Sequence, residues 1–215
     1  PEMVVQTDAV YGHDCLWQGP RGLAYSYLPN ATPLQKGNLY PDGKGTYWVA
    51  NFSGIPQGTE IEISGAFPYS RYMSYGVVQI DPVTGAAVST DEHFADHLIA
   101  PDKSSKNPFV AGEKRDTKPK KREYRVRVLA EDPPVDPGLR PENALYLGAD
   151  GSGALVYRVV LPDAGLDGAA GVGLPTYTAK LPSQVKLKGQ EVCDQLVTPL
   201  TQGTPPGMSL NQWLF

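Results

Sequence analysis

Glycine and proline interrupt this chain along its whole length, with 23 Gly and 21 Pro among 215 residues. This frequency is high for a helical protein and typical of a chain in which many turns join short strands. Hydrophobic residues make up 40% of the chain and charged residues 20%, so an ordinary core can be buried. The composition therefore favours an all-β sandwich or barrel.

Several segments between these turns have the residue pattern of strands. In residues 59–64, Ile61 and Ile63 alternate with polar residues, which is typical of a strand with one buried and one wet face. Residues 124–128 alternate in the same way, and the glycines of residues 148–153 suit a hairpin turn. Strands are predicted at residues 47–52, 59–67, 71–81, 124–128, 143–147, 154–161 and 176–181, and short helices at 90–99 and 189–197.

These elements predict an all-β fold, a two-layer antiparallel β-sandwich of jelly-roll type with one or two short helices. A partly closed barrel is the alternative. The sandwich is expected to span residues 45–197 and to include a long loop at residues 101–122. Irregular arms are expected at residues 1–44 and 198–215.

Cys15 and Cys193 are the two cysteines of the chain, 178 positions apart. An even and sparse count predicts a disulfide and hence an oxidising compartment, although two free thiols in a cytosolic protein would give the same count. Closing so long a loop would stabilise the fold by roughly 4 to 5 kcal/mol before strain is subtracted. Because no CxxC spacing occurs, the predicted bond is a structural link and not a redox centre.

The net charge of the chain limits the classes of partner that it can bind. A net charge of -4 argues against general nucleic-acid binding, and no stretch approaches the ~18 to 20 apolar residues that a membrane helix requires. One segment is basic, with Lys114, Arg115, Lys118, Lys120, Lys121 and Arg122 close together. A solvated loop is the first interpretation of this segment. A binding site for an anionic polymer or a membrane surface is the alternative, although interleaved aromatic residues are absent.

Several short motifs are spread along the chain: CLWQGP at 15–20, FPYSRYMS at 67–74, PD at 101–102 with NPF at 107–109, and LVYRVVLPD at 155–163. In this order they resemble a functionally uncharacterised family of exported bacterial β-sandwich proteins. The resemblance implies a β fold and a secreted or periplasmic location. It implies no reaction.

One set of aromatic and arginine residues suits ligand binding. Tyrosine rings give an apolar platform for a sugar ring, and guanidinium groups give fixed polar forks. Ordinary packing of the core and its rim is the alternative. The predicted ligand-binding residues are Arg71, Tyr72, Tyr75, Tyr157 and Arg158.

Two further groups could hold a metal ion. Asp163 and Asp167, in a Gly-rich loop, could contribute to a structural calcium site, although only two carboxylates are local. His93 and His97 would share one face of a helix at the spacing of zinc or copper ligands. In both cases the first interpretation is an ordinary solvated segment, so no cofactor is expected.

Three functions remain open from the sequence. The preferred one is a non-catalytic exported sandwich that binds a small molecule or a glycan on its aromatic and arginine face. The second is an exported enzyme for a small hydrophobic or sugar substrate, with Asp81 or Asp163 as acid or base beside Arg158. The third is a structural subunit of an envelope or extracellular assembly, a homo-oligomer formed through the terminal arms.

Overall fold

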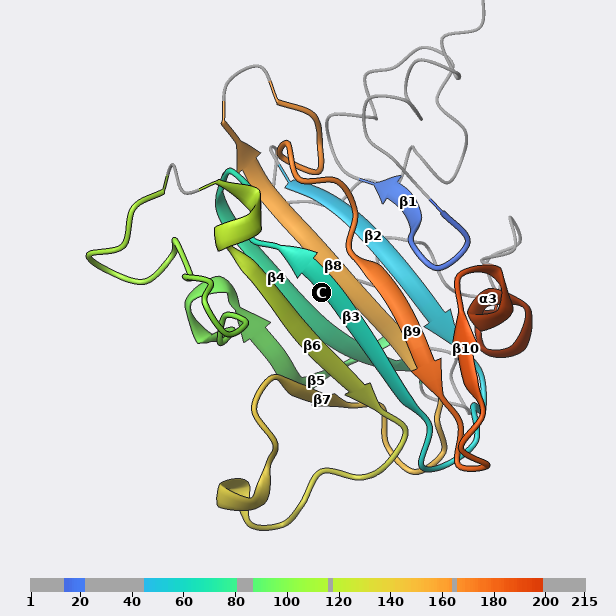
Figure 1. The fold of residues 1–215 in the computed structure, drawn as a ribbon. Helices are drawn as coiled ribbons and strands as arrows, with labels where there is room; N and C mark the ends of the chain where they lie inside the picture. The colour runs from blue at the N-terminus through green and yellow to red at the C-terminus, as the bar shows by residue number, and fades with distance from the viewer. Residues whose placement is uncertain (1–13, 22–44, 81–86, 116–117, 164–165, 199–215) are drawn as a thin grey trace, which may run out of the picture.

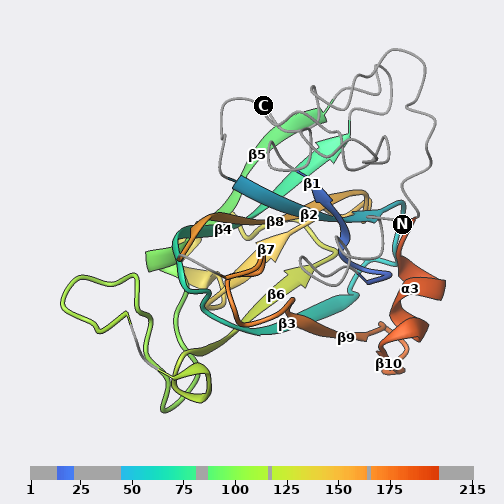
Figure 2. The same cartoon turned by 90° about the horizontal axis from the view of Figure 1, so that it is seen from above.

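The computed structural model describes residues 14–21, 45–80, 87–115, 118–163 and 166–198. These residues form two five-stranded sheets (Figure 1). Sheet A has the order β1-β2-β8-β4-β5 and sheet B the order β10-β9-β3-β6-β7. Figure 2 shows the two sheets as two layers, which confirms the predicted β-sandwich. The predicted arms lie mostly outside the described residues.

The strands range from three residues in β7 and β10 to eleven in β4. Sheet A consists of β1 (Gln18–Arg21), β2 (Gly45–Phe52), β4 (Ser70–Ile80), β5 (Ala87–Ala95) and β8 (Gly153–Pro162). Sheet B consists of β3 (Glu60–Ala66), β6 (Glu123–Leu129), β7 (Ala144–Tyr146), β9 (Thr176–Lys180) and β10 (Lys186–Lys188). Pairing is antiparallel except between β6 and β7. The helices are the 3-10 turns η1 (Asp96–Leu98), η2 (Pro119–Lys121) and η3 (Pro137–Leu139), and α3 (Gln190–Leu196).

The core between the sheets is unusually aromatic. Alternation along each strand sends every second side chain inward. On β3, for example, Ile61 and Ile63 are fully buried while Glu60 and Glu62 face outward. The aromatic side chains that are fully buried in the core are Trp17, Trp48, Phe67, Tyr75, Tyr124 and Tyr157.

The predicted helix over residues 90–99 is wrong for most of its length. β5 continues to Ala95, and only η1 follows it. The polar residues of β5 are held by partners far away in sequence: the buried carboxylate of Glu92 accepts hydrogen bonds from the Arg140 guanidinium and from the Tyr146 backbone N–H. Local sequence carries no sign of these partners. The strands β1 and β10 were also not predicted from the sequence.

The predicted disulfide is confirmed. The sulfurs of Cys15 and Cys193 are 1.98 Å apart, and their Cα atoms are 5.8 Å apart. Cys15 precedes β1 at one edge of sheet A, and Cys193 lies in α3, directly after β10 at one edge of sheet B. The bond therefore joins the two sheets along one side of the sandwich.

The edges of both sheets are poor templates for adding another strand. β1 has four residues, and β7 and β10 have three each. The longer edge strand, β5, is irregular, because its register against β4 shifts between Gly76 and Val78. Short and bulged edges are a common protection against edge-to-edge association. Assembly through the described strands is therefore disfavoured.

Candidate functional site

The structure divides the predicted aromatic platform between two faces of sheet A. Tyr75 and Tyr157 are fully buried in the core, where their rings stack with centroids 4.9 Å apart. Tyr72 and Arg158 occupy the alternate positions of the same strands and lie on the opposite face. Arg71 is exposed. Tyr72 and Tyr75 are three positions apart on β4, and an odd separation along a strand places two side chains on opposite faces. The five residues therefore do not form one surface.

On the outer face of sheet A, two of the predicted ligand-binding residues, Arg158 and Tyr72, lie side by side. The Arg158 guanidinium carbon is 5.2 Å from the centroid of the Tyr72 ring and 5.5 Å from that of Tyr47. Tyr47 belongs to a buried apolar cluster on this face, which also contains Val49, Ala154 and Val156. The arginine is thus engaged by tyrosines of its own chain, on a face that is largely closed to solvent.

The buried tyrosines form a small hydrogen-bonded group. The hydroxyls of Tyr75 and Tyr124 are 2.7 Å apart. A side chain at Gly65 would meet the Tyr124 hydroxyl at 2.8 Å, so this close approach requires glycine. Burial raises the pKa of Tyr75, Tyr124 and Tyr157 well above that of an ordinary tyrosine. These groups stay neutral and belong to the core.

Two of the three predicted catalytic residues, Asp163 and Arg158, lie within the described residues. Asp81 lies outside the described residues. Asp163 is half-exposed and pairs with Arg115, at 3.1 Å between Oδ1 and Nη2. Arg158 lies on the outer face of sheet A, where its guanidinium contacts Tyr47 and Tyr72.

The described residues contain no group of three or more His, Cys, Asp or Glu side chains that could hold a metal ion. Asp167 accepts a hydrogen bond from the Gly171 backbone N–H at 2.9 Å, as a local turn. His93 lies on β5, and His97 in η1 has its Nδ1 3.3 Å from Asp96 Oδ1. The helical spacing proposed for the two histidines is therefore wrong.

The basic loop is more structured than a solvated loop would be. Arg122 is 1% exposed, and its guanidinium donates to the backbone carbonyls of Arg115 and Pro68 and lies 3.8 Å over the Tyr69 ring. Burial lowers the pKa of Arg122. This side chain fixes the loop to the end of the sandwich, while Lys118, Lys120 and Lys121 remain exposed.

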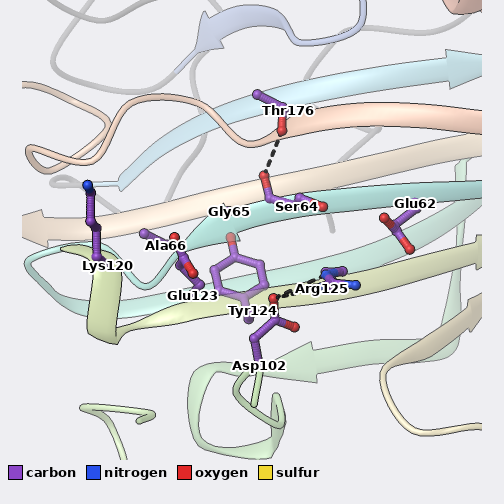
Figure 3. Close-up of a pocket in the computed structure, with 10 residues that line it drawn as sticks. All are labelled: Glu62, Ser64, Gly65, Ala66, Asp102, Lys120, Glu123, Tyr124, Arg125 and Thr176. Atoms are coloured by element: carbon purple, nitrogen blue, oxygen red, sulfur yellow. Dashed lines mark hydrogen bonds and ion pairs between the residues drawn. The ribbon is translucent and has the colours of Figure 1, made fainter. Parts of the chain in front are cut away.

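A hollow of about 520 Å³ opens on the outer face of sheet B (Figure 3). The strand register places Ser64 of β3 between Arg125 of β6 and Thr176 of β9. Lys120 of η2 is drawn at one end of the hollow and Glu62 of β3 toward the other. Asp102 and Glu123 complete its polar lining.

Some polar side chains of the hollow already have an ion-pair or hydrogen-bond partner within the chain. Arg125 forms an ion pair with Asp102, at 3.1 Å, and the Thr176 hydroxyl donates to the Ser64 backbone carbonyl at 3.2 Å. Within the described residues, four polar side chains of the hollow have no such partner. They are the carboxylates of Glu62 and Glu123, the hydroxyl of Ser64 and the ammonium of Lys120.

Sequence reasoning recognised the wet faces of β3 and β6 but did not recognise this site. The alternation of Glu60, Glu62 and Ser64 with isoleucines was the available signal. The register of β3 against β6 and β9, and the approach of Asp102 and Lys120 from a loop, depend on contacts between distant segments.

Comparisons with known proteins add little to this geometry. No family model matches the chain, and no curated protein matches it. One solved structure, described only as an uncharacterized protein from Burkholderia cenocepacia, is similar at 13% sequence identity and a TM-score of 0.39. The match covers 80% of this chain and 34% of that one, so this chain spans about a third of that protein's length. At this level the likeness carries no argument. Among the described residues, no helix is long and apolar enough to span a membrane.

Proposed function

We propose that this protein is an exported, non-catalytic β-sandwich that binds a small hydroxyl-rich molecule or a glycan unit in the hollow on sheet B. One observation carries the proposal. The hollow offers two carboxylates, a hydroxyl and an ammonium that have no partner within the described residues, on the rigid strands β3 and β6 and on η2.

The chemistry of these groups suits a sugar. Sugar hydroxyls donate hydrogen bonds to carboxylates and accept them from ammonium groups, and bonds to charged groups are the stronger ones. A volume of about 520 Å³ also falls within the usual range for small-molecule sites, about 300–1,000 Å³. The proposed ligand therefore contacts four residues: Glu62, Ser64, Glu123 and Lys120. In this proposal the tyrosines that the sequence predicted as ligand-binding contribute to the fold instead.

Binding is preferred over catalysis because the hollow is open. Glu123 is exposed and Glu62 is half-exposed, so water reaches both carboxylates. An acid or base of the alternative enzyme would be tuned by burial and by neighbouring groups, and these two carboxylates are not buried. Export is proposed from the Cys15–Cys193 disulfide, since such bonds persist in oxidising compartments.

The test is an NMR titration of the isotope-labelled protein with neutral, acidic and amino sugars and their short oligomers. Backbone amide shifts are expected along β3 and β6 for at least one of these ligands. The double variant Glu62→Gln with Ser64→Ala should weaken binding by at least about 10-fold, since a lost hydrogen bond to a charged group is alone worth about 1.5–3 kcal/mol and the neutral one adds to it.

The matched control is Glu60→Gln with Thr178→Ala. These residues lie on the same outer face, on β3 and β9, and do not line the hollow. Affinity should change less than twofold in this control. Shifts confined to the surroundings of Tyr72 and Arg158, or no shifts with any sugar, would overturn the proposal.

A further inference from the structure

The loop between β5 and β6 brings lysines together beside the hollow. Two of its segments are joined by hydrogen bonds from the Asp102 N–H to the Glu123 carbonyl, at 2.8 Å, and from the Lys106 N–H to the Lys121 carbonyl, at 2.9 Å. The loop projects from the side of the sandwich opposite to α3 (Figure 1). Exposed lysines of both segments therefore gather at one end of the molecule. We call four of them the lysine end: Lys103, Lys118, Lys120 and Lys121.

The positive charge of this lysine end is not neutralised locally. Lys106 pairs with Glu113 at 2.8 Å, and Arg115 pairs with Asp163. The four lysines of the lysine end have no carboxylate partner among the residues that the structure describes. Residues 103–122 contain eight basic and two acidic residues, in a chain with a net charge of -4. This asymmetry favours an anionic partner at this end.

Lys120 belongs both to this lysine end and to the hollow. From Lys120 the hollow continues along β3 past Ser64 toward Glu62 (Figure 3). We propose that the ligand is an acidic polysaccharide, whose carboxylate or sulfate groups pair with the lysine end while its hydroxyls occupy the hollow. This inference rests on the proposed function and names the class of glycan that the site takes.

A polysaccharide fits this surface better than other polyanions. Single-stranded nucleic acids are held largely by stacking on aromatic side chains, and the aromatic residue of the hollow, Tyr124, is fully buried. Duplex DNA carries one charge per roughly 1.7 Å, and such a density would place phosphates against Glu62 and Glu123. A flat membrane surface could pair with the lysines but would leave Ser64 and Glu62, further along the hollow, without a partner.

The experiment compares two oligosaccharides that differ only in charge, a hexamer of galacturonic acid and its fully methyl-esterified form. Affinities are measured by calorimetry at low and at physiological salt. The acidic hexamer should bind at least tenfold more tightly than the ester at low salt, and this preference should shrink as salt screens the lysines. A thymidine oligonucleotide and vesicles of anionic phospholipid are the alternative ligands.

The test variant is Lys118→Gln with Lys120→Gln and Lys121→Gln, and the control is Lys180→Gln with Lys186→Gln and Lys188→Gln. Both remove three exposed lysines, but the control residues lie on β9 and β10, away from the loop. The test variant should lose at least tenfold in affinity for the acidic hexamer, and the control less than threefold. Thermal unfolding of both variants confirms that they are folded.

The outcomes separate this inference from the proposed function. Equal binding of the acidic and esterified hexamers at low salt overturns the acidic ligand and leaves glycan binding in place. Equal losses in the test and control variants also overturn it, because they indicate a general effect of net charge. Tighter binding of the oligonucleotide or the vesicles overturns the choice of polysaccharide. Failure of every sugar in both experiments overturns the proposed function itself.

Discussion

The two faces of sheet B are built from alternate residues of the same strands and have opposite chemistry. On β6, Tyr124 and Val126 point into the core and are fully buried, while Glu123 and Arg125, which alternate with them, are exposed. Each inner side chain is surrounded by other apolar groups of the core. The outer side chains have few partners, such as the ion pair of Arg125 with Asp102.

This difference separates stability from binding within one sheet. Burial of apolar area and close packing on the inner face supply most of the stabilisation. Charges on the outer face contribute little to folding, because solvent screens them. The outer face can therefore carry polar groups that bind a ligand. Substitutions of these groups should change binding without changing the fold.

The largest expected effect comes from truncating an inner residue next to an outer one. Ile63→Ala removes a fully buried side chain of β3 and leaves a cavity, so the free energy of unfolding should fall by about 2–5 kcal/mol. Ser64→Ala, one position further along the same strand, should change it by less than about 0.5 kcal/mol. Urea unfolding of both variants measures the difference. Comparable losses would show that the outer face is part of the stabilising structure.

The fold was predictable from sequence where the pattern is local. β3 and β6 are recognised by strict alternation, and the disulfide by the cysteine count. β5 was not recognised, because its polar residue Glu92 is held by Arg140 and Tyr146, which are far away along the chain. Local propensity is overridden by such tertiary contacts.

The candidate site was less predictable than the fold. The ligand-binding prediction combined Tyr72 and Tyr75, which alternation along a strand places on opposite faces. The hollow depends on the alignment of Thr176, Ser64 and Arg125 across three strands, and only the strand register reveals it. Sequence alone shows that these residues face water and does not show that they meet.

The next largest expected effect is a loss of stability at high pH, which tests the burial of the core tyrosines. Burial raises the pKa of Tyr75, Tyr124 and Tyr157 above the ordinary value of about 10. Above pH 10 the unfolded chain loses these protons first, so the folded state is stabilised fully below pH 10 and progressively less above it. Each tyrosine should remove about 1.4 kcal/mol of stability per pH unit in this range.

Urea unfolding between pH 8 and pH 11, together with the absorbance of tyrosinate, measures this loss. Tyr157→Phe offers a control, because it removes one of the three titrating hydroxyls and keeps the ring that stacks on Tyr75. The decline above pH 10 should be shallower in this variant than in the parent protein. Titration of all three tyrosines near pH 10 in the folded protein would contradict the burial of the cluster.

The smallest expected effect comes from the ion pair on the outer face. Arg125 and Asp102 are 56% and 24% exposed, so their attraction is screened and should be worth no more than about 1 kcal/mol. A double-mutant cycle with Arg125→Gln and Asp102→Asn measures the coupling between them, and it should approach zero in high salt. A coupling above about 2 kcal/mol that persists in salt would mean that the outer face is held together by its charges. In that case the polar groups of the hollow would be structural, and the separation of stability from binding across sheet B would fail.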